Sequence, residues 1–196
     1  MKRLVLASAS VSRAELLRAA GVEFSVHPAE LDETALMATM TGADAASVAL
    51  ALAEAKALAV SAALPGSLVL GADTVIALGG DLISKCPDME AARTLLGRMS
   101  GQDHRLVSAA VLARDAKAVW RHAGPATMTV RPLSPAFVED YLAAEGPAIL
   151  SSVGCYHYEG RGAQLFEKVE GDYFSVLGLP LLPLLGALRQ EGVIAS

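Results

Sequence analysis

The stretch Leu68-Val69-Leu70-Gly71-Ala72-Asp73-Thr74-Val75-Ile76-Ala77-Leu78-Gly79-Gly80-Asp81-Leu82-Ile83-Ser84-Lys85 predicts the centre of the fold. It opens with an apolar run long enough for a buried strand, which leads to a single carboxylate, Asp73. Two short extended runs follow, separated by Gly79-Gly80, the two-residue signal for a tight hairpin. The hairpin returns the chain to Lys85, after which a Cys-Pro pair stops the strand. We therefore expect Asp73, at a strand end, and Lys85, beyond the hairpin, to meet at one edge of a sheet.

Asp73 and Lys85 are residue types suited to a phosphate-handling site. A carboxylate can hold a divalent cation and orient water, and a lysine can neutralise phosphate oxygens. The alternative is that Asp73 only terminates a strand and that Lys85 is solvated. The stretch by itself favours this alternative.

Composition limits the classes of function. The 196 residues suffice for one compact domain, which we expect to span residues 1–196. Hydrophobic residues make up 53% of the chain and charged residues 19%, so a large core is easily built and disorder is not expected. The formal net charge is −5 and no Lys/Arg run exceeds Lys2-Arg3, so we expect no nucleic-acid partner. Any phosphate site must be local, made of a few cations, backbone amides or a metal ion.

Cysteine usage and apolar segments predict a cytoplasmic protein without a membrane span. Cys86 and Cys155 lie far apart in sequence and resemble reduced intracellular thiols more than a disulfide framework. Residues 1–10 imitate a signal peptide, but their apolar centre is too short and charged residues follow at once. The uncharged tract 174–188 is broken by glycine and proline and is shorter than the roughly 20 apolar residues that a span needs.

The N-terminal segment has the features of an anion site. Residues 4–6 predict a buried strand, and a serine-rich turn that includes Ser8 leads to a helix capped by Ser12 with Glu15 in a capping box. Free amides and the positive end of the helix dipole would point outward there. The positive charge of Arg13 in the first turn is unfavourable to that dipole. The presence of an arginine at this position therefore needs a reason other than helix stability. The alternative is an ordinary capped helix with a solvated arginine.

The remaining segments predict a mixed α/β sheet. Glu30-Leu31-Asp32-Glu33 is either a solvated loop or part of a magnesium or manganese site beside phosphates. A long alanine-rich helix over about residues 44–63 carries Lys56. Strands alternate with helices, but hairpins and consecutive strands intrude, which excludes a pure doubly wound sheet. Further strands are expected over 104–113, 118–122, 126–131 and 165–169, a tight turn over 170–173, and helices after Asp88, Ser134 and Gly178.

Several of these segments, in this order, resemble the Maf family of nucleotide pyrophosphatases over nearly the whole chain. The matching motifs are Leu6-Ala7-Ser8-Ala9-Ser10-Val11-Ser12-Arg13, Leu52-Ala53-Glu54-Ala55-Lys56-Ala57, Gly71-Ala72-Asp73-Thr74 with Lys85-Cys86-Pro87, Glu159-Gly160-Arg161-Gly162-Ala163, and Glu170-Gly171-Asp172-Tyr173. Each motif alone is weak, whereas several in fixed order are specific.

The resemblance implies an elongated twisted sheet flanked by helices, with two lobes around a central cleft, as in inosine-triphosphatase-like proteins. It implies hydrolysis of a nucleoside triphosphate to the monophosphate and pyrophosphate, with a divalent cation (Mg²⁺ or Mn²⁺) as cofactor. It also implies a homodimer, and a link to the removal of non-standard nucleotides and to division arrest. It implies catalytic roles for Asp73, Glu33 and Lys85, of which Asp73 and Glu33 would also hold the metal ion. It implies that Ser8, Arg13 and Lys56 bind the phosphates. It implies that Ser12, Thr74 and Glu159 determine base specificity.

Three positions bear on the nucleobase. The family branch linked to dTTP and UTP carries arginine, lysine and glutamine where this chain has Ser12, Ser152 and Glu159. The branch linked to 7-methyl-GTP has tryptophan at the Ser12 position and shares the glutamate. This chain matches neither branch fully. An ionised carboxylate can accept the two adjacent donors of guanine, so Glu159 favours a purine-type triphosphate, guanine or a modified guanine.

The sequence disfavours one other class of function and leaves a second one open. A dinucleotide-binding fold requires glycines in the first strand–helix turn, and residues 7–12 contain none. A non-enzymatic division regulator that acts through a protein partner leaves no mark in the sequence and stays an alternative.

Overall fold

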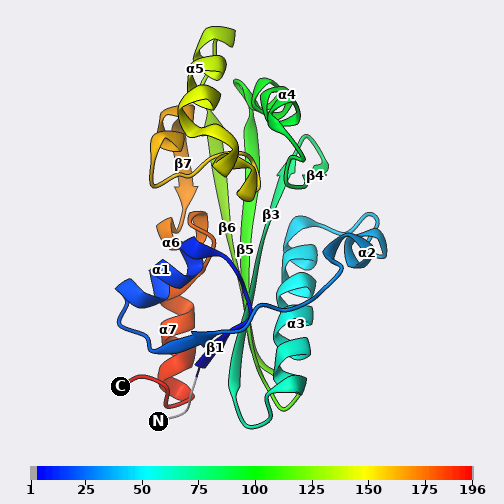
Figure 1. Cartoon of the computed structure of the whole chain (residues 1–196), viewed down its shortest axis with the longest axis vertical. Coiled ribbons are helices and arrows are strands. Elements are labelled where there is room, and N and C mark those ends of the chain that lie inside the picture. The colour runs from blue at the N-terminus through cyan, green and yellow to red at the C-terminus, as the bar shows by residue number, and fades with distance from the viewer. Residues whose placement is uncertain (1–3, 196) are drawn as a thin grey trace.

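A mixed sheet runs along the length of the molecule in the computed structural model, which describes residues 4–195 (Figure 1). Within those residues the sheet has seven strands in the order β2-β1-β3-β5-β6-β7, with β4 paired to β3. The β1–β2 and β1–β3 pairs are parallel and the others antiparallel, which confirms the predicted mixed sheet. The strands are β1 (Leu4–Leu6), β2 (Phe24–Val26), β3 (Leu68–Leu78), β4 (Asp81–Ile83), β5 (Asp103–Arg114), β6 (Lys117–Val130) and β7 (Phe166–Gly171).

Helices cover both faces of the sheet and gather at its two ends. At one end α3 lies on one side of the long strands and α1 and α7 on the other, while α4 and α5 lie at the opposite end (Figure 1). The helices are α1 (Val11–Ala19), α2 (Glu33–Ala38), α3 (Ala45–Ala63), α4 (Met89–Met99), α5 (Pro135–Glu145), α6 (Tyr173–Val176) and α7 (Leu181–Gln190), with 3₁₀ turns η1 (Gly146–Ser151) and η2 (Arg161–Leu165). Separate hydrophobic clusters underlie the two ends, which gives the predicted two-lobed arrangement.

The alternation of side chains along β3 and β5 sorts residues between the two faces. Leu68 and Leu70 pack with α1 and α7, whereas Val75 packs with α3. Gly71 lies on the α3 face at a point where helix and strand almost touch. A Cβ at Gly71 would lie 2.0 Å from the carbonyl oxygen of Ala53, so any side chain there would push α3 away from the sheet.

Helix α3 is long and apolar enough, by length and composition, to cross a membrane. Half of that window is buried inside the protein, and Val48, Leu52 and Val60 of this helix are almost wholly buried. A single helix of this kind is weak support for a membrane span, because the core helix of a folded domain passes the same test. Its packing against β3 and β5 accounts for its apolar composition.

The predicted hairpin is confirmed. Leu78 pairs with Asp81, and the two glycines between them, Gly79 and Gly80, have φ of 59° and 96°. Both values lie in the left-handed region that a two-residue hairpin turn requires. The predicted helix N-caps Asp88 and Ser134 are confirmed by their side-chain bonds to the backbone three residues on, and Asp44 caps α3 in the same way.

Asp73 is not at the end of a strand, contrary to the prediction. β3 continues without interruption through Asp73, because β5 pairs with it from Val69 to Ala77. The carboxylate is tolerated inside the strand because it has a cationic partner, described below.

Ser12 is not the N-cap of α1, contrary to the prediction. Ser10 has the extended backbone of a cap (φ −65°, ψ 120°), and its side chain accepts from the amide of Arg13. The helix therefore begins one residue before Ser12. Several serines compete for the cap, and only the path of the turn after β1 decides between them.

Two further boundaries differ from the prediction. Strands 118–122 and 126–131 form one strand, β6, which passes through Pro125. β7 pairs with β6 only from Ala126 onward, so the missing amide of Pro125 faces no neighbouring strand on that side. Residues 170–173 are not a tight turn: Gly171 ends β7, and Asp172 caps α6.

Candidate active site

A gap along one edge of β3 positions the site. On the side opposite β5, β1 pairs with residues 68–70 of β3 and β4 pairs with residues 76–78. Among the described strands none pairs with residues 71–75 on that side, so this part of the edge is open. A cleft of about 960 Å³ includes Asp73, Thr74 and Val75 in its lining. Because successive side chains of a strand alternate, Asp73 points to the α3 face and Thr74 to the opposite one.

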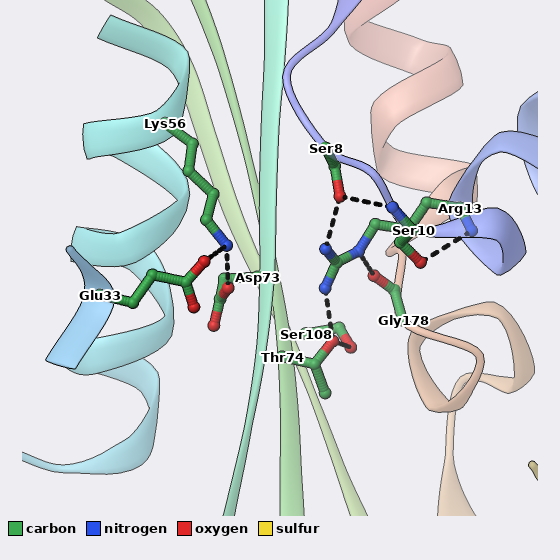
Figure 2. Close-up of polar contacts among 9 residues, drawn as sticks. All are labelled: Ser8, Ser10, Arg13, Glu33, Lys56, Asp73, Thr74, Ser108 and Gly178. Atoms are coloured by element: carbon green, nitrogen blue, oxygen red, sulfur yellow. Dashed lines mark hydrogen bonds and ion pairs between the residues drawn. The ribbon is translucent and has the colours of Figure 1, made fainter. Parts of the chain in front are cut away.

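Lys56 lies between two carboxylates on the α3 face (Figure 2). Its Nζ is 2.6 Å from Oδ1 of Asp73 and 2.7 Å from Oε1 of Glu33. Lys56 and Asp73 are buried, with 8% and 7% of their surface exposed, while Glu33 at the start of α2 is half exposed. Buried charges persist only when they are paired, so the opposed charges keep both carboxylates in place beside the open edge. Gly71 supports this geometry, since it lets α3 approach closely enough for Lys56 to reach Asp73.

Arg13 occupies the other face of β3 and is held as a planar fork (Figure 2). Its Nε donates to the carbonyl oxygen of Gly178 at 3.0 Å, its Nη1 to Oγ of Ser8 at 3.0 Å, and its Nη2 to Oγ1 of Thr74 at 3.1 Å. Burial lowers the pKa of the Arg13 guanidinium, and the negative charges of Asp73 and Glu33 oppose that shift.

The donor count of Arg13 leaves capacity for a ligand. A guanidinium has five N–H groups in fixed directions. Three of them are used by the partners just described within residues 4–195. The two others belong to the terminal nitrogens of a side chain that lines the cleft. Arg13 can therefore bind an anionic group without giving up its internal bonds.

The remaining predicted residues lie on the rim of the same cleft. Lys85 and Glu159 are exposed and line it from the lobe that contains α4 and α5. Ser12 lines it from the first turn of α1. The structure thus brings every predicted site residue to one cleft, with Asp73, Lys56 and Glu33 in direct contact and Lys85 and Glu159 apart from them. Their individual roles stay predictions.

Residues 3–191 match the sequence model of the family described as Maf-like protein. The chain belongs to the Maf family. A 7-methyl-GTP pyrophosphatase of Brucella suis biovar 1 (strain 1330) is 52% identical over 194 residues, which cover 98% of each chain. A nucleoside triphosphate pyrophosphatase of Maricaulis maris (strain MCS10) is 46% identical over 194 residues, which cover 99% of each chain.

A HAM1 protein from Coxiella burnetii is similar to part of the structure. It covers 66% of this chain and 73% of its own length, with a TM-score of 0.44 and 16% sequence identity. Membership of the Maf family rests on the sequence matches and not on this partial overlap.

The donor set suits a divalent cation that arrives with phosphate. Among residues 4–195 no three His, Cys, Asp or Glu side chains gather as a metal cluster. The Maf cleft instead offers two carboxylates, Asp73 and Glu33, that contact the same lysine nitrogen. Mg²⁺ commonly takes one or two protein carboxylates and completes its shell with phosphate oxygens and water. The residues present therefore fit an ion bound together with a triphosphate.

Sequence reasoning missed the residues that hold the loop bearing Glu159. Tyr156 lies at the base of this loop, and its hydroxyl is 2.9 Å from Nε2 of buried His104. Tyr141 donates to the carbonyl oxygen of Cys155, and Ser152 donates to that of Tyr156 at 2.7 Å. Burial lowers the pKa of His104 to about 4, so the ring is neutral at neutral pH. No spacing in the sequence connects these residues.

The two cysteines are neighbours in space although they are far apart in sequence. Cys86 packs against the hydrophobic cluster that contains Cys155. Burial, with a further contribution from Cys86, raises the pKa of the Cys155 thiol to about 12. Both residues are free thiols, as predicted.

Proposed function

We propose that this chain hydrolyses a nucleoside triphosphate to the nucleoside monophosphate and pyrophosphate in the cytoplasm, with the triphosphate lying across the open edge of β3. This proposal rests on the observation that Asp73 and Arg13 flank this edge from opposite faces of one strand. The names of the relatives at 52% and 46% identity support the same reaction.

The chemistry requires a base on one side and cations on the other. Water attacks the α phosphorus, a proton of that water passes to the Asp73 carboxylate, and the bond from the α phosphorus to the bridging oxygen breaks. The bridging oxygen leaves with the pyrophosphate. Arg13, Lys56 and Lys85 neutralise the charge that develops on the phosphate oxygens. An acidic protein needs such a local group of cations, because its overall field repels a triphosphate.

We propose Mg²⁺ or Mn²⁺ as the cofactor, held by Asp73 and Glu33 together with the substrate. When bound, the ion would polarise phosphate oxygens and offset their charge. The ammonium of Lys56 contacts both carboxylates and so keeps them side by side.

The first prediction concerns the bond that is cleaved. In water enriched in ¹⁸O, the label is expected in the nucleoside monophosphate, because attack occurs at the α phosphorus. The products are separated and weighed by mass spectrometry. Label in pyrophosphate, or release of orthophosphate and a diphosphate, would contradict the mechanism. Parallel reactions with EDTA, Mg²⁺ or Mn²⁺ test the cofactor: activity is expected only with an added ion.

The second prediction concerns the base. Glu159 lies exposed on the rim, where an ionised carboxylate can accept both N1–H and the exocyclic amine of guanine. Uracil and thymine present one donor between two carbonyls, which a carboxylate repels. The relative named 7-methyl-GTP pyrophosphatase is consistent with a guanine-type substrate, and a methylated guanine adds positive charge to the ring.

We therefore expect GTP and 7-methyl-GTP to exceed UTP in kcat/KM, and Glu159→Gln to lower that preference by about tenfold or more, since the site then loses an acceptor. Glu167→Gln is the matched control, because Glu167 is an exposed residue of β7 outside the cleft lining. A wild-type preference for UTP or dTTP that Glu159→Gln leaves unchanged would remove the base assignment and leave the reaction intact.

A further inference from the structure

Ser108 is a polar residue inside an apolar strand. Its neighbours along β5, from Leu106 to Ala113, are otherwise hydrophobic and buried, and Ser108 itself has 0% of its surface exposed. It is absent from the described residues that line the cleft. A buried hydroxyl is costly unless it is hydrogen-bonded. Its partners therefore indicate why a serine stands there.

The hydrogen bonds of Ser108 have a defined direction. Its Oγ donates to the carbonyl oxygen of Ser175 at 2.7 Å, and this uses its single proton. The 2.9 Å contact between Ser108 and Thr74, its direct cross-strand neighbour, must then be donated by Thr74. Thr74 therefore directs its hydroxyl proton to Ser108, and its Oγ1 accepts from Nη2 of Arg13. Figure 2 shows the Arg13–Thr74 contact.

The hydrogen bond from Nε of Arg13 also leads to Ser175. Gly178 accepts from Nε of Arg13, and the amide of Gly178 donates to the carbonyl oxygen of Ser175 at 3.0 Å. Ser175 is anchored in turn, because its amide and its hydroxyl both donate to Oδ2 of Asp172. Two of the three contacts of the guanidinium, at Nε and at Nη2, therefore lead to the carbonyl oxygen of Ser175.

We propose that Ser108 is a positioning residue for Arg13: through Thr74 it orients the guanidinium so that its two remaining N–H groups meet the phosphates of the substrate. Ser108 touches neither the cleft nor the reacting atoms. Its effect on turnover passes through the direction of one hydroxyl. This inference rests on the proposed function, because it presumes that Arg13 binds phosphate.

The test is a double-mutant cycle on the full chain, with Ser108→Ala, Arg13→Lys and the combined variant. Ser108→Ala is expected to lower kcat/KM for the triphosphate and to weaken binding of inorganic tripolyphosphate by about tenfold each, the size of one buried hydrogen bond. In the Arg13→Lys background the same change is expected to cost less than about twofold, because coupled residues are not additive.

Ser61→Ala is the matched control. Ser61 lies on α3, is also wholly buried and is outside the cleft lining. Its Oγ accepts a hydrogen bond from the amide of Ala116 at 3.1 Å. Its loss is expected to lower the melting temperature without changing tripolyphosphate binding. Thr74→Val is expected to reproduce Ser108→Ala, and Thr74→Ser, which keeps the hydroxyl, to lose less tripolyphosphate binding than Thr74→Val. The difference between these two variants decides the question if Ser108→Ala fails to fold.

Two outcomes overturn the inference. One is a Ser108→Ala enzyme that differs from Ser61→Ala in no kinetic or binding constant. The other is a tenfold loss that persists in the Arg13→Lys background. Tripolyphosphate binding is measured by calorimetry without turnover, so it separates this inference from the reaction. A wild-type protein that binds tripolyphosphate but cleaves the wrong bond contradicts only the proposed function.

Discussion

Asp73→Asn is expected to lower kcat by about 10²-fold or more, the usual contribution of a general base, because the amide keeps the shape of the side chain and loses its charge and basicity. The fold is expected to persist. Lys56 still has Glu33 at 2.7 Å, so its buried ammonium keeps a carboxylate partner. The measurement is single-turnover pyrophosphate release, accompanied by a thermal melt.

Asp81→Asn is the control for this variant. Asp81 begins β4, is exposed, and pairs with Arg98 at 2.8 Å outside the cleft lining. It is expected to keep wild-type turnover. If folded Asp73→Asn protein turns over as fast as Asp81→Asn, then Asp73 is only a strand residue with a salt bridge.

Arg13→Lys is expected to lower kcat/KM by about 10²-fold, because a lysine keeps the charge and loses the planar fork that aims donors at phosphate. The variant also gives up the bonds to Gly178, Ser8 and Thr74 that orient the side chain. Since Arg13 lines the cleft, water can solvate the oxygens that it leaves. We therefore expect a larger effect on kinetics than on melting temperature.

Arg18→Lys provides the comparison on the same helix. Arg18 is exposed and stacks over Phe24, with its guanidinium carbon 5.6 Å from the ring centroid. Its replacement is expected to leave kcat/KM within about twofold of wild type, since surface substitutions are usually mild. Equal kinetics of Arg13→Lys and wild type would show that the positive charge alone is needed at Arg13.

Local features of the fold were predictable because short-range interactions determine them. Gly79-Gly80 require a hairpin, and residues such as Asp44 and Asp88 satisfy helix amides three positions on, whatever lies around them. The predictions were wrong where a segment distant in sequence determines the local structure. Asp73 lies within a strand because β5 continues past it, and Pro125 is accommodated because β7 pairs with β6 only from Ala126 to Val130.

The candidate site was predictable in its residue types and not in its connections. Asp73, Lys85, Arg13 and the acidic run 30–33 suggested metal and phosphate chemistry by their charges and positions. The family resemblance singled out Glu33 within that run and gave Lys56 a role. Nothing local relates Ser108 to Arg13, since 95 positions separate them in the sequence and only Thr74 of β3 links them in the folded chain. The sequence signal for the role of Ser108 is that it is a lone serine in an apolar run.

The sequence by itself determined the kinds of elements, the turn at Gly79-Gly80 and the charged groups available for catalysis, because backbone propensity and side-chain chemistry act over a few residues. The tertiary structure decided where those groups meet. The open edge of β3 exists because β1 ends at Leu6, opposite Leu70, and β4 ends at Ile83, opposite Ile76. Lys56 reaches Asp73 because Gly71 admits α3 to the strand. Both depend on packing between segments distant in sequence, and only the folded chain brings such segments together.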